Sequence, residues 1–189
     1  VWGPSGSGKS TLLNMIGAID APTTGTVRLR GQDLAALDDN RRSDLRNKTI
    51  GFVFQNFNLV AVLSALENVM LPLQIGGMAV PEARARAASC LDEVGIAKFS
   101  HHRPDQLSGG QRQRVSIARA LAPKPALVIA DEPTANLDSE TALKIVELMR
   151  ELNRRDQTTF LFSTHDQRLL DHVDRRIELA DGLLKGGAS

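Results

Sequence analysis

The sequence has no tyrosine, one cysteine and one tryptophan among its 189 residues. The single cysteine, Cys90, excludes an internal disulfide, and its place in an apolar pattern with helical spacing predicts that it lies in the core. No apolar run approaches the roughly 18 residues that a membrane-spanning helix needs. If the protein works at a membrane, we therefore expect a partner to hold it there.

The sequence also lacks an excess of charge of either sign. Lysine and arginine together number 23, aspartate and glutamate 22, and the formal net charge is +1. This balance gives no general attraction to polyanions, so we expect no nucleic-acid partner. With 42% hydrophobic and 24% charged residues, the composition is typical of a globular domain that can bury a core without disulfides.

The chain begins with Val1 and not with methionine, and Val1–Trp2 has the character of the end of a buried strand. We therefore expect the sequence to be N-terminally truncated and to form a single domain over 1–189. Residues 26–30, "TVRLR", alternate apolar and basic side chains, which predicts a half-exposed strand. We expect the upstream segment to provide strands that pair with it.

The spacing of apolar residues predicts an α/β fold interrupted by helices. Apolar runs at 49–55, 126–130 and 159–164 predict buried strands of a mainly parallel sheet. We expect one helix that ends at Gly17, a second from Pro81 to Gly95, a third from near Ser108 to before Pro123, and a fourth over 139–154. Because the middle of the chain is mainly helical, we expect a core formed by 1–57 and 123–189 and a helical insertion at 58–122.

Residues 3–10 read G-P-S-G-S-G-K-S, which matches the phosphate-loop pattern G-x-x-x-x-G-K-[ST]. Glycines let the backbone turn its N–H groups around an oxyanion, and the helix that follows directs its positive end at the same point. Lys9 can reach the β- and γ-phosphates, and the Ser10 hydroxyl can bind Mg²⁺. The predicted nucleotide-binding residues are Gly3, Pro4, Ser5, Gly6, Ser7, Gly8, Lys9, Ser10 and Thr11. The flanking strand and helix favour a phosphate loop over a glycine-rich surface turn.

Polar side chains follow two of the predicted strands: Asp131 and Glu132 after 126–130, and His165 after 159–164. Ligands of parallel sheets bind beyond the carboxyl ends of the strands, so we expect these residues beside the phosphate loop. On their own, an acidic pair is also typical of a turn, and a lone histidine of a structural residue. The phosphate loop favours catalytic roles, with Asp131 holding Mg²⁺ and Glu132 accepting a proton from the attacking water. His165 is expected to contact the γ-phosphate.

These motifs, in this order, resemble those of ATP-binding cassette (ABC) ATPases, and the resemblance covers essentially the whole chain. The matching segments are Walker A at Gly3–Thr11, the Q-loop Gln55, the LSGGQ signature at Leu107–Gln111, Walker B at Leu127–Glu132, the D-loop Ala135–Asp138 with its Asp138, and the switch histidine His165. The resemblance implies a P-loop NTPase core with an inserted helical subdomain, and ATP and Mg²⁺ as cofactors of ATP hydrolysis. It assigns catalysis to Glu132, His165 and Gln55, and the metal to Ser10, Gln55 and Asp131.

The resemblance also implies partners. ABC cassettes pair head to tail, so the signature residues Ser108, Gly109, Gly110 and Gln111 would contact the ATP held by a second copy of the ATPase. The positive end of the helix after Ser108 would take the place of a lysine there. A groove near Asn56–Pro72 would receive a short helix of an integral membrane permease. That permease would hold the ATPase peripherally at the cytoplasmic face of the inner membrane.

Residues Gly51–Leu73, "GFVFQNFNLVAVLSALENVMLPL", are similar to cassettes of the lipoprotein-release and macrolide-export type. This implies export or release of a lipoprotein, amphiphile or drug. A regulatory ABC ATPase that drives a cell-wall or division complex without transport is the alternative. Chromosome-maintenance and DNA-repair relatives carry a long coiled coil between Q-loop and signature. Gln55 and Ser108 are only 53 positions apart, without sustained heptads, which excludes that class.

Overall fold

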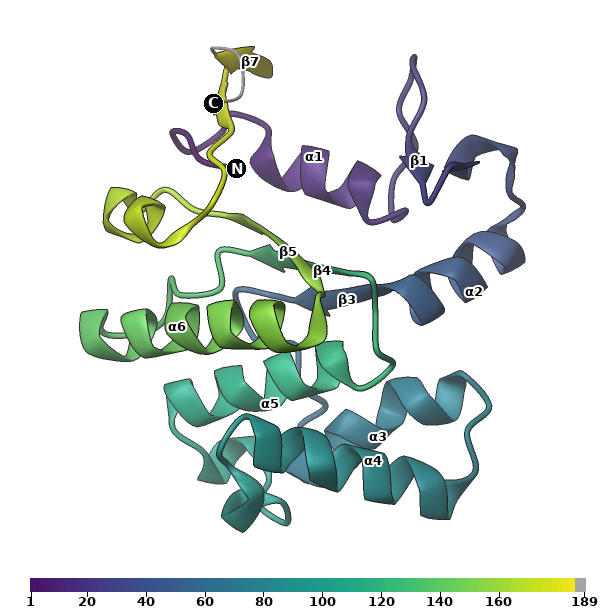
Figure 1. The fold of residues 1–189 in the computed structure, drawn as a ribbon, viewed down its shortest axis with the longest axis vertical. Helices are drawn as coiled ribbons and strands as arrows, with labels where there is room; N and C mark the ends of the chain where they lie inside the picture. The colour runs from purple at the N-terminus through teal and green to yellow at the C-terminus, as the bar shows by residue number, and fades with distance from the viewer. Residues whose placement is uncertain (186–189) are drawn as a thin grey trace.

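A small parallel sheet lies near the middle of the molecule in Figure 1. The computed structural model describes residues 1–185, and the side chains of all of these except 167–169. The three strands of the sheet are β3 (Ile50–Val53), β4 (Leu127–Asp131) and β5 (Thr159–Ser163). They pair in parallel in the order β3-β4-β5, which confirms the prediction of parallel strands from the apolar runs.

The first residues of the chain lie beside β5. Trp2 makes single parallel bridges to Thr164 and to Glu178 at the start of β6 (Glu178–Ala180). The amino group of Val1 donates to the carbonyl oxygen of Phe162 at 2.7 Å. Strand β6 turns back in an antiparallel hairpin with β7 (Leu183–Lys185). Trp2, directly before the phosphate loop, therefore lies between the end of β5 and the start of β6. The loop starts at the edge of the sheet formed by the carboxyl end of β5.

Side chains of the sheet alternate between two apolar layers, as the pleat requires. On one face, Ile50 and Ile129 form a small cluster with Leu13. On the other face, Val53 and Val128 belong to a large cluster that continues into the helical part of the chain. The predicted helices are confirmed as α1 (Lys9–Ile16), α4 (Val80–Glu93), α5 (Gly109–Leu121) and α6 (Ser139–Asp156). Helix α1 covers the first face, and α5 and α6 lie on the second (Figure 1).

The segment between α1 and β3 departs from the sequence-based expectations. The predicted strand at 26–30 is only two residues long, β1 (Arg28–Leu29), and it pairs with the neighbouring β2 (Gln32–Asp33). Helix α2 (Asp39–Thr49) was not predicted. It is almost entirely polar and so carries no apolar stripe to reveal it. Asp38 begins α2 by accepting a hydrogen bond from the Arg41 amide at 2.8 Å.

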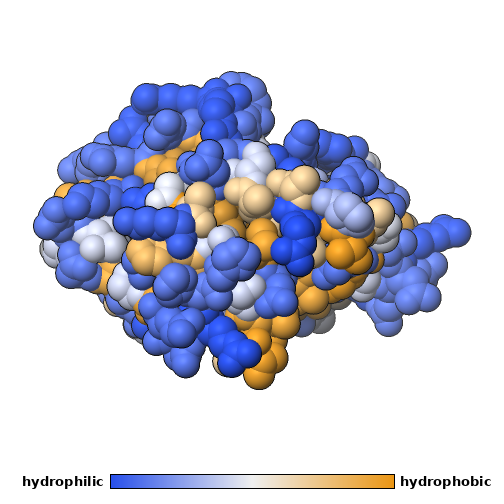
Figure 2. Space-filling model, turned by 90° about the horizontal axis from the view of Figure 1, so that it is seen from below, coloured by the Kyte–Doolittle hydropathy of each residue, from blue (hydrophilic) through white to orange (hydrophobic). Residues whose placement is uncertain are grey.

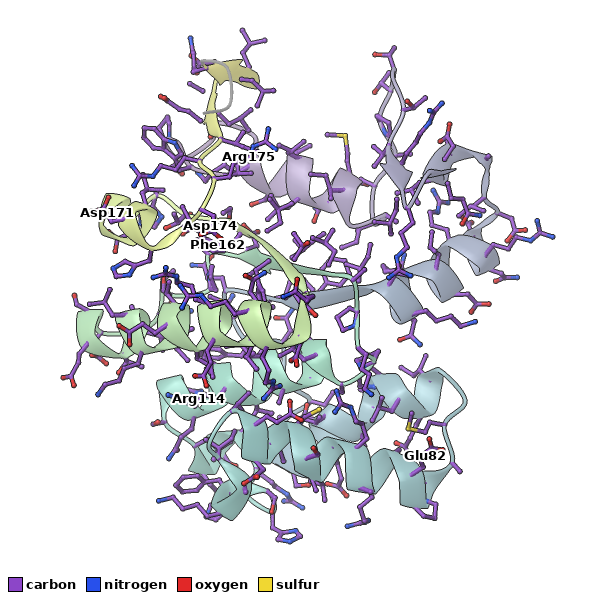
Figure 3. The ribbon with its side chains drawn as sticks, in the orientation of Figure 1. Glu82, Arg114, Phe162, Asp171, Asp174 and Arg175 are labelled. Carbon is purple, nitrogen blue, oxygen red and sulfur yellow. The ribbon has the colours of Figure 1, made fainter. Side chains whose placement is uncertain are left out.

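Helices α3 (Ala65–Ile75), α4 and α5 pack together as the helical part of the fold. Helix α3 begins with a capping box in which Ser64 and Glu67 exchange hydrogen bonds. Cys90 of α4 is 1% exposed, as predicted from its helical spacing. Arg114 of α5, labelled in Figure 3, donates to the Val94 carbonyl at 2.7 Å and so ties α5 to the end of α4. Short 3-10 helices span Leu34–Ala36, Ala97–Phe99, Pro104–Gln106 and Gln167–His172.

The outer surface of the helical part is not uniformly polar. Figure 2 views the molecule from below and shows hydrophobic residues exposed between hydrophilic ones. The large exposed apolar side chains include Ile75 at the end of α3 and Val80 at the start of α4. Within residues 1–185, no helix combines the length and the apolar character needed to cross a membrane.

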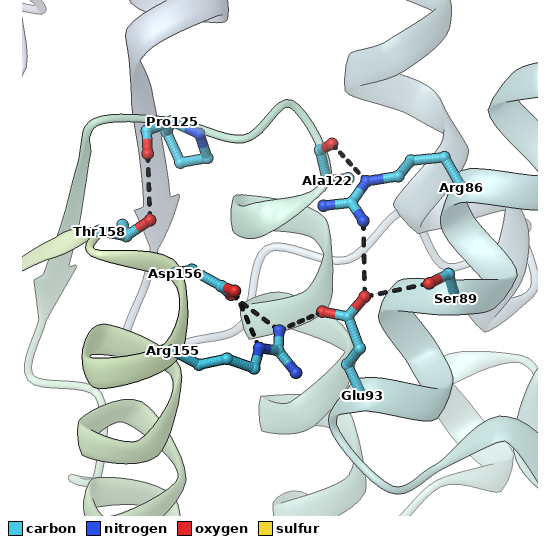
Figure 4. Close-up of polar contacts among 8 residues, drawn as sticks. All are labelled: Arg86, Ser89, Glu93, Ala122, Pro125, Arg155, Asp156 and Thr158. Atoms are coloured by element: carbon cyan, nitrogen blue, oxygen red, sulfur yellow. Dashed lines mark hydrogen bonds and ion pairs between the residues drawn. The ribbon is translucent and has the colours of Figure 1, made fainter.

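A network of charged side chains joins α4 to the end of α6 (Figure 4). The Glu93 carboxylate accepts hydrogen bonds from Arg155 at 2.5 Å, from Ser89 at 3.0 Å and from Arg86 at 3.5 Å. Arg86 also donates to the carbonyl of Ala122, just after α5. These contacts connect the helical part to the sheet-bearing part, and the residues that make them are far in sequence from the phosphate loop.

Candidate functional site

The phosphate loop is held open by glycine conformations. Gly3, Gly6 and Gly8 have φ angles of 152°, 78° and 94°, which side-chain-bearing residues rarely adopt. At Gly3 a Cβ atom would also lie 2.0 Å from the carbonyl oxygen of Leu179 in β6. Gly8 precedes α1 and has no side chain to cap that helix, so the first amide groups of α1 are available to an anion.

Lys9 is 7% exposed and lies across this loop. Its Nζ donates to the carbonyl oxygens of Gly3 and Pro4, each at 2.9 Å. Both acceptors are neutral carbonyls, whereas a phosphate oxygen carries a negative charge that attracts the ammonium group in addition to accepting its proton. The ammonium group is therefore held where an incoming phosphate can draw it away from the loop carbonyls.

An open pocket of about 430 Å³ lies in front of the loop. Its lining residues are Ser5, Gly6, Ser7, Gly8, Lys9, Ser10, Thr11, Gln55, Glu132 and His165. The structure thus brings together candidate residues from four segments that are far apart in the sequence. The signature residues 108–111 are not among the described residues that line it.

Glu132, directly after β4, lines the pocket together with His165. Glu132 has a φ angle of 47°, a left-handed conformation that is uncommon for a residue with a side chain. Its Oε1 lies 2.9 Å from Nδ1 of His165. Glu132 is 16% exposed and His165 is 64% exposed, so the carboxylate lies deeper and the histidine at the rim.

Asp131 is the last residue of β4, and its hydrogen-bond partner, Ser163, was not predicted from the sequence. The Ser163 hydroxyl donates to Oδ1 of Asp131 at 2.5 Å and accepts from the Glu132 amide at 3.1 Å. Residues 131 and 163 are also register partners on β4 and β5. Ser163 is fully buried.

The chemistry of the donors fits Mg²⁺. This ion prefers oxygen ligands, and a protein site commonly offers one or two carboxylates and leaves other positions to water and substrate phosphates. Ser10 and Gln55 line the pocket, and Asp131 directly precedes Glu132, which also lines it. A hydroxyl, an amide oxygen and a carboxylate are thus present near the expected phosphate position.

Gln55 follows β3 by two residues and connects to the D-loop. Asn136 donates from Nδ2 to the carbonyl oxygen of Gln55 at 2.8 Å and to Oδ1 of Asn56 at 3.2 Å. This contact was also not foreseen from the sequence. The Gln55 segment and the D-loop are therefore joined by side-chain hydrogen bonds.

The signature forms the start of α5 and lies against the D-loop. Ser108 and Gln111 form a capping box, with the Ser108 amide donating to the Gln111 side chain at 2.8 Å. A Cβ atom at Gly110 would lie 2.7 Å from Cγ2 of Thr141 in α6, so only glycine allows this approach. Asp138 caps α6, and hydrogen bonds from Thr141 lower the pKa of its carboxyl group, which stays ionised at neutral pH.

Known proteins that are similar to this chain indicate its family. The family model described as "ABC transporter" matches residues 1–135. The lipoprotein-releasing system ATP-binding protein LolD of Anaeromyxobacter dehalogenans is 55% identical over 183 residues, covering 96% of this chain and 77% of that protein. LolD of Pseudomonas fluorescens is 52% identical over 184 residues, covering 97% of this chain and 81% of that protein.

Solved structures agree with the sequence relatives. The dimeric post-hydrolysis state of the ATP-binding cassette MJ0796 bound to ADP and Pi has a TM-score of 0.89 and 46% identity, covering 100% of this chain and 82% of that one. A second dimeric structure of MJ0796, described as a bacterial ABC transporter cassette, has a TM-score of 0.88 and 47% identity, covering 98% and 82%. The chain therefore belongs to the ABC transporter family and is one of its ATP-binding cassettes.

Proposed function

We propose that this ABC ATPase powers a membrane complex that releases lipoproteins, by closing head to tail with a second copy around ATP and reopening after hydrolysis. The substrate class is supported by the 55% and 52% identity to LolD proteins. The observation that carries the closure mechanism is the division of the site. The phosphate pocket is lined by the loop, Gln55, Glu132 and His165, while the signature lies with the D-loop at the start of α5 and α6.

The residues of the pocket divide the work on ATP. The phosphate loop and Lys9 bind the β- and γ-phosphates, and Asp131, Ser10 and Gln55 hold Mg²⁺, directly or through water. The metal neutralises charge on the phosphate oxygens when it is bound. Glu132 accepts a proton from the attacking water, and His165, which contacts its carboxylate, orients it and reaches the γ-phosphate.

The signature completes the pocket of the other copy. Ser108 and the first amide groups of α5 form a positive helix end that lies outside the phosphate pocket of the same copy. In the closed dimer they would face the γ-phosphate held by the partner. The charge of that phosphate attracts donors from both copies, and hydrolysis removes the attraction.

The membrane partner would bind the groove between the sheet-bearing and helical parts. An open groove of about 380 Å³ is lined by Phe52 and Phe54 and by Leu71 and Ile75 of α3. Arg119 also lines the groove and donates to the carbonyls of 57 and 58, just after Gln55. Burial lowers the pKa of Arg119. A permease helix in this groove would sense the Gln55 segment and would keep the ATPase at the cytoplasmic face of the inner membrane.

The test is Glu132→Gln, with the same change at the exposed Glu147 of α6 as a matched control. Loss of a general base lowers the turnover number by about 10²–10⁴-fold, while ATP still binds. With ATP and Mg²⁺, light scattering should then show a stable dimer of the Glu132→Gln variant only. A monomer under these conditions, together with lost hydrolysis, would contradict the closure mechanism.

A further inference from the structure

We propose that Ser163 is a positioning residue for ATP hydrolysis, one hydroxyl that orients both Walker B carboxylates. The inference rests on the function proposed above for Asp131 and Glu132. Ser163 ends β5, two residues before His165, and reaches across to the end of β4.

The direction of the two hydrogen bonds follows from their chemistry. A serine hydroxyl has one proton and two acceptor lone pairs. The Glu132 amide can only donate, so at 3.1 Å it must use a lone pair of Ser163. The proton of the hydroxyl is then directed to Oδ1 of Asp131, 2.5 Å away. The two hydrogen bonds therefore run in one direction: the Glu132 N–H donates to Ser163, and Ser163 donates to the Asp131 carboxylate.

Each of these two hydrogen bonds orients one carboxylate-bearing residue. At Asp131, the bond occupies Oδ1 and fixes the plane of the carboxylate, so that Oδ2 would be the oxygen available to a metal ion. At Glu132, the bond holds the backbone in its left-handed conformation of φ 47°, and that conformation sends the side chain toward His165. Ser163 is fully buried, which limits the access of water to its hydroxyl.

A purely structural role would make different demands. A serine that only fills space at the end of β5 could be replaced by any residue of the same shape. The chain offers such a serine for comparison: Ser116 of α5 is equally buried, and its hydroxyl has no hydrogen-bond partner among the described residues.

The experiment compares Ser163→Thr with Ser163→Val. Threonine and valine have the same shape and add the same volume, so both variants crowd the site equally and differ only in the hydroxyl. Ser163→Ala, which adds no volume, is the second variant in case valine prevents folding, and Ser116→Ala is the control. The readouts are turnover number and KM for ATP, and Mn²⁺ affinity in the presence of ADP by electron paramagnetic resonance.

Removal of groups that orient metal ligands typically costs about 10–100-fold in metal affinity or activity. We expect a loss of this size in Mn²⁺ affinity and in turnover for the valine and alanine variants relative to the threonine variant. Nucleotide binding without divalent cation should be equal in all of them, and Ser116→Ala should match the wild type.

Equal turnover and equal Mn²⁺ affinity of the threonine and valine variants would overturn the role of Ser163. If Glu132→Gln abolishes hydrolysis in the same assay, that result leaves the proposed function intact and rejects only the positioning role. If Glu132→Gln hydrolyses ATP at the wild-type rate, the proposed function fails and this inference fails with it.

Discussion

Substitution of Glu93 by glutamine tests whether the charged network of Figure 4 holds the helical part against the rest of the molecule. Glutamine keeps the shape of the side chain and one acceptor oxygen but removes the charge. Glu93 is 22% exposed and accepts from Arg155 and Ser89 within 3.0 Å, whereas Arg86, at 3.5 Å, is at the limit of hydrogen-bond geometry.

The magnitude follows from these contacts. A hydrogen bond to a charged group contributes about 1.5–3 kcal/mol, and charge assistance supplies roughly half of that. Arg155 is 46% exposed and keeps its bond to Asp156 at 2.8 Å, which limits the loss to one interaction. We therefore expect Glu93→Gln to lower the free energy of unfolding by about 1 kcal/mol, which lowers the Tm of a chain of this length by about 2–4 °C.

Thermal unfolding followed by circular dichroism measures this shift. Glu140→Gln is the matched control, because Glu140 pairs with Lys144 at 2.6 Å on the exposed face of α6. The control should leave Tm unchanged, since exposed pairs on a helix surface contribute little. Equal shifts for the two variants would show that the network across α4 and α6 is no stronger than a surface pair, and would refute the reasoning.

Two further predictions concern the core. Gly51→Ala should lower the free energy of unfolding by about 1–3 kcal/mol, measured by urea unfolding, because its Cβ would lie 2.4 Å from the backbone oxygen of Ala120; an unchanged midpoint would mean that β3 and α5 are not in contact. Burial raises the pKa of the Cys90 thiol to about 11, so the thiolate is not formed at pH 8. Iodoacetamide should label Cys90 only after unfolding, and labelling of the native protein at the rate of a free thiol would contradict the packing of α4.

The sequence was sufficient to predict the elements that bury an apolar face. Continuous apolar runs mark β4 and β5 to within one residue, and apolar spacing marks α4 and α6. It was not sufficient for α2, whose stability depends on its cap and on charged side chains rather than on an apolar stripe. The strand predicted at 26–30 was longer than the observed β1, because alternation of apolar and basic residues does not show where a hairpin turns.

In the candidate site, too, some residues could be predicted from the sequence and others could not. Residues that stand in contiguous motifs, such as Ser5–Thr11 of the phosphate loop and Glu132, were predicted from the sequence and line one pocket. Ser163 was missed because a serine at the end of an apolar run is unremarkable, and its partners are more than 30 positions away. Only the pairing of β4 with β5 brings them together. Asn136 was missed for the same reason, since its contact with Gln55 joins segments 81 positions apart.

The central claim is that each ATP pocket is completed by the signature of the other copy, and mixing two inactive variants tests it most directly. Lys9→Ala disables the phosphate loop and Ser108→Arg disables the signature. If the pocket is shared, a mixed dimer has one pocket with both defects and one intact pocket. Mixing should then restore about a quarter of the wild-type rate, because half of the dimers are mixed and each has one working pocket of two.

A chain that carries both substitutions, mixed with the wild type, is the control, because each pocket of that mixed dimer has one defect. ATP hydrolysis is measured as phosphate release after the variants are mixed with ATP and Mg²⁺. A shared pocket predicts recovery of activity when Lys9→Ala and Ser108→Arg are combined. It also predicts about a quarter of the wild-type rate for the control mixture, all of it from wild-type homodimers, whereas pockets that are not shared would give the control about half of the wild-type rate. Two variants that stay inactive together, although light scattering shows that they form mixed dimers, would contradict a pocket shared between two copies.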